Sequence, residues 1–395
     1  MNRTDTGLLD ELLRRATVGL DADRVPGVVA ALTTSDGPVY TGCAGVRAAG
    51  GDEAMTSESV IALYSASKAL TATAVLQCVQ EGLLDLDAPA SRYLPEIAEI
   101  GVLDGYDEAG APRVRAPRTP ITTRMLLLHT AGFAYPFFDV DYRRLVRDGH
   151  APDVATATRA SLMTPLLFEP GTRWNYGSGM DWAGLVVEAV RGARLGDVLA
   201  DRVFAPLGME NSGFGLTDAM KAVRAAVHLR RPDGTLKATG IVMPQDPEVQ
   251  MGGQGLYSTV PDYLRFLRMW LRDGVGEGGS VLAPETIAWA VRSGLSPQQG
   301  VTALRSVDPV VSADCEFFPG QRKSWAYSFM VNDEPAPTGR SAGSLSWAGL
   351  ANVYFWIDRT ADLAGIWATQ LLPFADPVAL RAYLDFETAA YRSAA

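Results

Sequence analysis

Strand-like segments occur near both ends of this 395-residue chain, and this arrangement most constrains how the chain can fold. Val28 to Thr34 and Val39 to Val46 are apolar and rich in β-branched residues, and Ser35-Asp36-Gly37 between them is a turn sequence, so a hairpin is predicted here. Further strands are predicted late in the chain, at 344–347, 352–358 and 363–370. A sheet assembled from both ends is therefore expected.

Helical patterns dominate the residues between these strands. We predict an α/β (α+β) fold in which an antiparallel sheet flanked by helices carries an inserted helical domain. The sheet domain is expected to comprise residues 1–83 and 241–395, the helical domain residues 84–240, and the active site is expected between them. The longest loop is expected from Gly101 to Pro120. Helices are predicted near the amino terminus (Leu8, Leu9, Leu12, Leu13 and Val18), from Ser65 to Gly82, and at 122–128, 154–162, 181–191, 195–203 and 377–391.

The net charge of the chain makes some classes of binding partner unfavourable. The chain has 45 Asp and Glu against 35 Lys and Arg, a formal net charge of -10, which repels phosphate backbones and argues against a nucleic-acid partner. A stretch from Arg113 to Arg124 is basic but interrupted by prolines, and it is interpreted as a solvated loop. No apolar run reaches membrane-spanning length, and the first residues lack the apolar core of a signal peptide. We expect a soluble, cytoplasmic protein with no membrane partner.

The number and spacing of the cysteines also favour a cytoplasmic protein. Cys43, Cys78 and Cys315 have no metal-ligand spacing and are too few for a disulfide framework, so a reducing compartment is expected. No metal-ligand cluster or phosphate-cradling loop occurs in the sequence, and we expect neither a metal nor a cofactor. The sequence leaves the oligomeric state open.

Two segments offer a nucleophilic serine. Gly339-Arg340-Ser341-Ala342-Gly343 matches G-x-S-x-G, but that motif should follow a strand, open a helix and precede a histidine. Prolines precede this segment, a strand pattern follows it, and His129, His150 and His228 all lie upstream. We interpret the match as a glycine-rich loop and His129 as a structural histidine.

The second candidate is Ser65-Ala66-Ser67-Lys68, an S-x-x-K pattern at the start of the long apolar helix. A spacing of three residues on a helix brings Lys68 to the same face as Ser65. A serine hydroxyl needs a base before it becomes a good nucleophile, and a buried lysine can lose its proton near neutral pH. By pattern alone, the alternatives are a helix cap for Ser65 and a surface cation for Lys68.

Several segments, in the same order, resemble class C β-lactamases and family VIII carboxylesterases. Leu63-Tyr64-Ser65-Ala66-Ser67-Lys68 resembles the first motif of that family. Further similar segments read ITTRMLLLHTAGF (121–133), EPGTRWNY (169–176) and GGQGLYSTVPDYLRF (252–266). The resemblance extends from about residue 20 to residue 370, and it implies a penicillin-binding-protein-like fold.

The resemblance also implies roles for individual residues. Tyr176 would act with Lys68 as the general base, while Ser178 stands where the family has asparagine in Y-x-N. Asp181 matches an aspartate of some esterase members and would support the site, and Tyr135 matches a tyrosine that lines it. At the family's K-T-G motif this chain has Trp347-Ala348-Gly349-Leu350. The backbone N–H of Leu350 would complete an oxyanion hole with that of Ser65.

The missing K-T-G lysine shifts the expected substrate. In β-lactamases that lysine helps to bind a carboxylate, whereas Trp347 offers an apolar wall and one N–H donor. We therefore predict a serine carboxylesterase that hydrolyses a small or medium ester, with Trp347, Gly349, Tyr135 and Ser178 binding the substrate. The alternatives are an acyltransferase of the same fold that passes the acyl group to an alcohol, a β-lactamase or D-amino-acid peptidase, and a non-catalytic binding scaffold.

Overall fold

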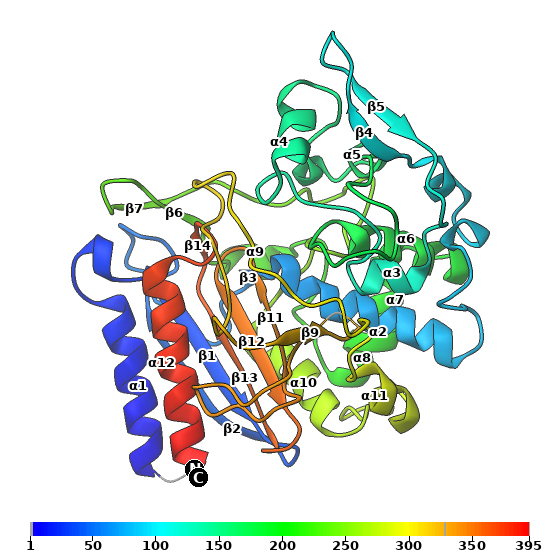
Figure 1. Ribbon diagram of the computed structural model, residues 1–395. Helices are drawn as coiled ribbons and strands as arrows, with labels where there is room; N and C mark the ends of the chain where they lie inside the picture. Colours follow the sequence, from blue (N-terminus) through cyan, green and yellow to red (C-terminus); the bar gives the residue numbers. More distant parts are fainter. Residues whose placement is uncertain (1–2, 328, 395) are drawn as a thin grey trace.

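The computed structural model describes residues 3–327 and 329–394, in which a seven-stranded antiparallel sheet forms the centre (Figure 1). Strands from both ends of the chain meet where Val29 pairs with Ala368, which confirms the predicted sheet. The strand order is β2-β1-β13-β12-β11-β10-β9. The bounds are β1 Gly27–Thr33, β2 Pro38–Gly45, β9 Lys323–Trp325, β10 Met330–Asn332, β11 Leu345–Gly349, β12 Val353–Asp358 and β13 Leu363–Ala368.

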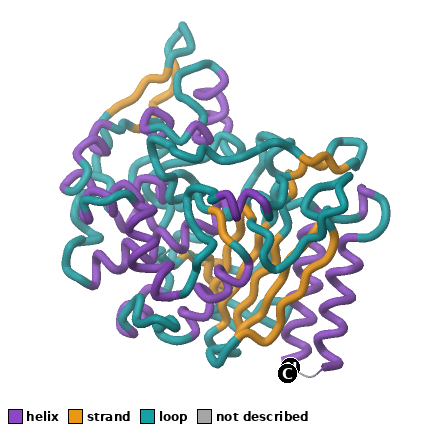
Figure 2. The backbone as a smooth tube through the Cα atoms, turned by 180° about the vertical axis from the view of Figure 1, so that it is seen from behind, coloured by secondary structure: helices purple, strands orange, loops and turns teal. Residues whose placement is uncertain are grey.

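Helices cover both faces of the sheet. α1 (Arg3–Thr17) and α12 (Pro377–Ala394) pack side by side, and α10 (Val260–Leu271) contacts β1, β12 and β13. Every residue of β1, β12 and β13 is therefore buried, which explains why their sequences do not alternate and are apolar except for Thr33 and Asp358 at strand ends. Figure 2 shows the sheet between the helical region and the α1–α12 pair.

The helical region is built around α2 (Ser67–Gln80), which contacts α6 (Gly179–Arg191) and α7 (Leu195–Leu199). None of the helices in the described part of the chain is long and apolar enough to cross a bilayer. The other helices are α3 Thr123–Leu127, α4 Val140–Arg147, α5 Arg159–Leu162, α8 Ala205–Leu207, α9 Asp218–Ala222 and α11 Pro284–Ala290. Short strands are β3 Ile61–Ala62 with β8 Tyr257–Ser258, β4 Val102–Tyr106 with β5 Pro112–Arg115, and β14 Leu371–Leu372 with β6 His228–Arg230 and β7 Leu236–Ala238.

Three local predictions were wrong. The expected loop from Gly101 to Pro120 contains the β4–β5 hairpin, whose turn at 107–111 is closed by Asp107. The helix expected at 154–162 is broken by Ala157, whose φ of 52° ends a short 3-10 turn before Thr158 caps α5. The helix expected to start at Ser65 starts at Ser67, because residues 64–66 form a 3-10 turn.

The sheet takes its strands from residues 27–45 and 323–368, and helices α3 to α9 lie between them in the sequence. The division into domains at residues 84 and 240 stays a prediction. Cys78 and Cys315 are buried and Cys43 is exposed, and all three are free thiols.

Candidate active site

The turn before α2 fixes the position of Ser65. Tyr64 has a φ of +46°, a backbone conformation that residues other than glycine seldom adopt. The turn that contains it is buried against β11 and β12. Tyr263 of α10 holds this turn from the other side, because its hydroxyl donates to the Ala66 carbonyl at 2.9 Å. Ser65 is consequently half-buried at the start of the helical region, while Lys68 one turn later has no exposed surface.

Three oxygen atoms surround the Lys68 ammonium group. Nζ donates to Ser65 Oγ at 3.1 Å, to the Tyr135 hydroxyl at 3.0 Å and to the Gly253 carbonyl at 2.7 Å. These three acceptors match the three hydrogens of an ammonium group. The structure thus brings together Ser65, Lys68 and Tyr135, and it adds a backbone carbonyl for which the sequence assigned no role.

Gly253 links Lys68 to Asp181. Its N–H donates to Asp181 Oδ1 at 2.7 Å, while its carbonyl accepts from Lys68. A Cβ atom at position 253 would lie 2.9 Å from both carboxylate oxygens, so only glycine lets this peptide fit between the two charged groups. The glycine pair at 252–253 was the sequence signal for this element, but nothing in it indicated which side chains the peptide would join.

Tyr176 lies on the other side of the nucleophile. Its hydroxyl accepts a hydrogen bond from Trp347 Nε1 at 3.0 Å. Lys68 Nζ is 4.9 Å from the centre of the Tyr176 ring. Ser178 is buried at the start of α6, where its carbonyl accepts from the Asp181 N–H at 3.0 Å, so it lies behind the site and not in its lining.

The end of β11 closes the site. A Cβ atom on Gly349 would lie 2.2 Å from the Leu63 carbonyl, so the strand reaches the nucleophile turn only because this residue is glycine. A small pocket at this junction is lined by both predicted oxyanion-hole residues and by Tyr176. Its lining residues are Ser65, Phe137, Phe138, Tyr176, Leu304, Trp347, Ala348, Gly349, Leu350 and Phe374.

Burial changes the proton affinities of these groups. Burial lowers the pKa of Lys68, against the opposing effect of the Asp181 carboxylate, and burial raises the pKa of Asp181, against the opposing effect of Lys68. Burial also raises the pKa of Tyr135 and of Tyr176, although hydrogen bonds from Ser65 and Trp347 oppose the shift at Tyr176. A neutral lysine amine is therefore more accessible near pH 7 than a tyrosine phenolate.

The rejected alternatives have structural roles. Ser341 lies in a turn that leads into β11, and its N–H donates to Asp358 Oδ2 at 2.7 Å, so the segment lacks the helix that an esterase elbow requires. His129 is buried beside Tyr176 and accepts from the Gly177 N–H at 3.4 Å. Burial and the nearby Lys68 cation lower the pKa of His129, which keeps the ring neutral.

Known proteins resemble this chain over almost its whole length. Monacolin J acid methylbutanoyltransferase of Aspergillus terreus is 31% identical over 97% of this chain and 95% of its own length. Lovastatin esterase of Penicillium rubens is 30% identical over 89% of this chain and 90% of its own. A mutant form of simvastatin synthase from Aspergillus terreus matches in structure with a TM-score of 0.86 and 31% identity, covering 99% of this chain and 96% of that one.

By their names, these relatives include a methylbutanoyltransferase and an esterase. The family model described as Beta-lactamase matches residues 12–390. The predicted fold and the predicted class of serine hydrolase are thereby confirmed, while membership of family VIII in particular stays a prediction. The chain belongs to the Beta-lactamase family.

Proposed function

We propose that this protein is an acyltransferase that takes an acyl group from an ester or thioester onto Ser65 and passes it to an alcohol, with hydrolysis as the competing reaction. Acyl transfer is thus placed before hydrolysis, whereas the sequence analysis favoured hydrolysis. The relatives that transfer an acyl group support the change, and the esterase relative supports hydrolysis as the second candidate.

The observation that carries the proposal is the set of contacts around Lys68. Its Nζ atom is 3.1 Å from Ser65 Oγ, and Asp181 and Tyr135 are fixed around it without access to solvent. A base in this position removes the Ser65 proton as Oγ attacks the carbonyl carbon. Because burial lowers the pKa of Lys68 and raises that of Tyr176, Lys68 is the proton acceptor in this proposal. Tyr176 then donates its phenolic proton to the leaving oxygen and is reprotonated by the Lys68 ammonium group.

The second half of the reaction repeats these steps in reverse. Tyr176 takes the proton of the attacking acceptor alcohol while it passes its own phenolic proton to the neutral Lys68 amine, and Lys68 gives a proton to the Ser65 oxygen as it leaves. The backbone N–H groups of Ser65 and Leu350 are proposed to hold the oxyanion in both steps. The aromatic lining from Phe137, Phe138 and Phe374 favours a bound organic alcohol over water.

A β-lactamase or D-amino-acid peptidase activity is less well supported. Trp347 replaces the lysine that would bind a substrate carboxylate, and its only N–H donor already hydrogen-bonds with Tyr176. A non-catalytic scaffold is also disfavoured, because such a role gives no reason to bury Lys68 against a serine hydroxyl.

The test is a partition experiment. The protein would be given p-nitrophenyl butanoate with increasing concentrations of a series of alcohols, and butanoate esters and free butanoic acid would be quantified by mass spectrometry. We expect an alcohol from this series to divert most of the acyl group into ester, with no product from Ser65→Ala. Free acid as the sole product with every alcohol would leave hydrolysis as the function, and turnover by Ser65→Ala would remove Ser65 as the nucleophile.

A further inference from the structure

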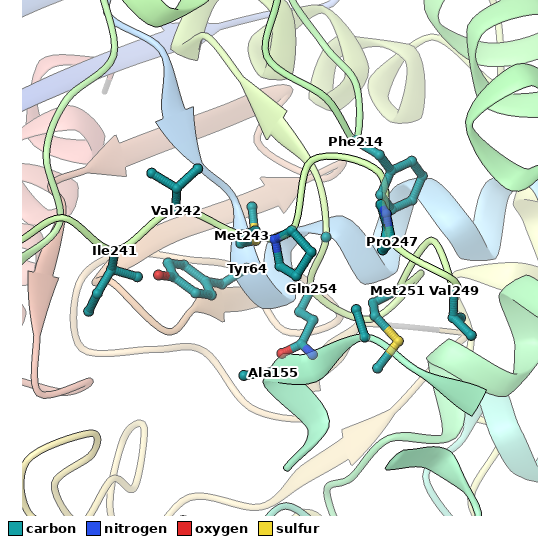
Figure 3. Close-up of a pocket in the computed structure, with 13 residues that line it drawn as sticks. Tyr64, Ala155, Phe214, Ile241, Val242, Met243, Pro247, Val249, Met251 and Gln254 are labelled. Carbon is teal, nitrogen blue, oxygen red and sulfur yellow. The ribbon is translucent and has the colours of Figure 1, made fainter. Parts of the chain in front are cut away.

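A second pocket is lined by Tyr64, the residue that precedes Ser65, and by none of the predicted site residues. Its cavity volume is about 120 Å³. Figure 3 shows the Tyr64 ring on one side of it and the side chains of Phe214 and Met251 on the other. The segment at 241–251, between the short strand β7 and the glycine pair, supplies most of its wall.

Some residues that line this pocket are neighbours of the catalytic groups along the chain. Tyr64 precedes Ser65 in the chain, and Gln254 and Gly255 follow Gly253, whose carbonyl binds Lys68. Leu350, which lines the small pocket at Ser65, packs against the hydrophobic cluster that contains Tyr64. Two pockets that share no lining residue thus lie close to Ser65.

The position of the proton donor distinguishes the two pockets. A leaving alcohol must lie near Tyr176 to receive a proton, and Tyr176 lines the pocket that also contains Phe137 and Phe138. The alcohol side of an ester is thereby directed into that aromatic pocket. The remaining arm of the ester, its acyl chain, is directed toward Tyr64.

We infer that the pocket beside Tyr64 binds the acyl chain and selects uncharged aliphatic chains longer than acetyl; this inference rests on the proposed acyl transfer. No side chain that lines it is charged, so a carboxylate or ammonium group on the acyl chain would lose its hydration without compensation. Met243 and Met251 add flexible, polarisable walls that accept branched chains. Gln254, a polar residue in the lining, donates its side-chain N–H to the Val154 carbonyl at 3.3 Å.

The mouth of the pocket is also apolar. Ile241 and Val242 line it and are 42% and 41% exposed. Exposed aliphatic side chains beside an apolar cavity are typical of a binding site for an apolar group. Ala155 faces the same pocket from the opposite segment and is exposed, so a larger side chain can be placed there without disturbing the core.

The test compares acyl chain lengths in a blocked variant. We expect kcat/KM for p-nitrophenyl hexanoate to exceed that for the acetate by at least about tenfold, because each buried methylene contributes a factor of about four. In Ala155→Trp, whose indole would fill the pocket, the hexanoate-to-acetate ratio should fall by about tenfold. Thr156→Trp is the matched control: this exposed neighbour does not line the pocket, and the ratio should stay at the wild-type value.

Two further comparisons make the outcome decisive. Ethyl hexanoate and hexyl acetate place the same chain on opposite sides of the ester. If Ala155→Trp selectively impairs hexyl acetate, the pocket binds the alcohol and the inference is overturned. An unchanged hexanoate-to-acetate ratio in Ala155→Trp would also overturn it.

A binding measurement separates this inference from the proposed function. In a Ser65→Ala background, calorimetry would compare binding of p-nitrophenyl hexanoate and acetate with and without Ala155→Trp. An inactive wild-type protein would refute the proposed function, and binding would then decide on the pocket alone. Weaker hexanoate binding in Ala155→Trp supports the inference, and equal binding overturns it.

Discussion

Two clusters of buried charge in this protein contain the same kinds of side chain: a cation, a carboxylate and a tyrosine. One cluster joins Arg340 to Glu387 and Tyr383 and ties the turn before β11 to α12. The other holds Lys68, Asp181 and Tyr135 beside Ser65. Both cations and both carboxylates are at most 1% exposed, so burial alone does not distinguish the clusters.

The two clusters differ in whether the cation and the carboxylate are in direct contact, as they are in the Arg340 cluster. Arg340 Nε and Nη2 donate to the two Glu387 oxygens at 2.7 and 2.8 Å, a bidentate ion pair. Burial alone would lower the pKa of Arg340, but Glu387 and Tyr383 outweigh it and raise the pKa. These charges are locked in place, which suits a structural role.

At the catalytic cluster a peptide group keeps the charges apart. Gly253 accepts from Lys68 and donates to Asp181 Oδ1, while Asp181 Oδ2 has no hydrogen-bond partner among the described residues. Burial consequently dominates, and the pKa of Lys68 falls while that of Asp181 rises. The comparison suggests that separating the two charges by one peptide is what makes Lys68 able to act as a base.

Replacing the catalytic cation should have the largest effect on activity. In Lys68→Met the Ser65 proton loses its acceptor, and we expect kcat/KM for acyl transfer to fall by about 10³- to 10⁴-fold. The free energy of unfolding should change little, because removal of a costly buried charge is offset by the loss of its attraction to the buried Asp181 carboxylate. Steady-state kinetics and urea unfolding check both statements. A loss of activity below about tenfold would show that Lys68 is not the base.

Breaking the structural pair should have the opposite pattern. Glu387→Gln leaves Arg340 charged and buried without its carboxylate, so the free energy of unfolding should fall by about 3–5 kcal/mol. At temperatures where the variant is folded, kcat should equal that of the wild type. The matched control is Glu11→Gln, which removes an exposed pair with Arg14 and should cost at most about 1 kcal/mol. A loss of kcat in folded Glu387→Gln would contradict the division of roles.

Neutralising the catalytic carboxylate should change the pH dependence of the reaction. The Asp181 carboxylate favours the ammonium form of Lys68 and so raises its pKa. Asp181→Asn removes this effect while keeping an oxygen acceptor for Gly253, so the neutral amine is present at lower pH. The acid limb of the kcat/KM–pH profile should move down by about one unit. An upward shift would exclude Lys68 as the group that titrates, and Glu387→Gln should leave the profile unmoved.

The smallest effect is expected at Trp347. Trp347→Phe keeps an aromatic wall but removes the N–H that donates to the Tyr176 hydroxyl at 3.0 Å. One hydrogen bond of this kind contributes about 0.5–1.5 kcal/mol, so kcat/KM should fall by about tenfold or less. A loss comparable to that of Lys68→Met would show that the indole N–H contacts the reacting atoms instead of supporting Tyr176.

The sequence by itself determined the features that depend on short-range geometry. A spacing of three residues places Lys68 beside Ser65, and Asp181, five residues after Tyr176, lies in the first turn of α6. Continuous apolar runs predicted the strands that the two ends of the chain contribute to the sheet. These patterns are visible in a sequence because each one is fixed within one or two turns of backbone.

Only the tertiary structure decided how distant segments meet. Gly253 comes between Lys68 and Asp181 through packing of three separate segments, and no local pattern specifies that contact. The acyl pocket is likewise formed by residues near 64, 155, 214 and 241–255. The pKa of Lys68 depends on this packing too, because the desolvation of a charge is set by everything that surrounds it. The proposed nucleophile could therefore be identified from the sequence, whereas the pKa of its proposed base and the shape of the proposed substrate pocket depend on long-range packing.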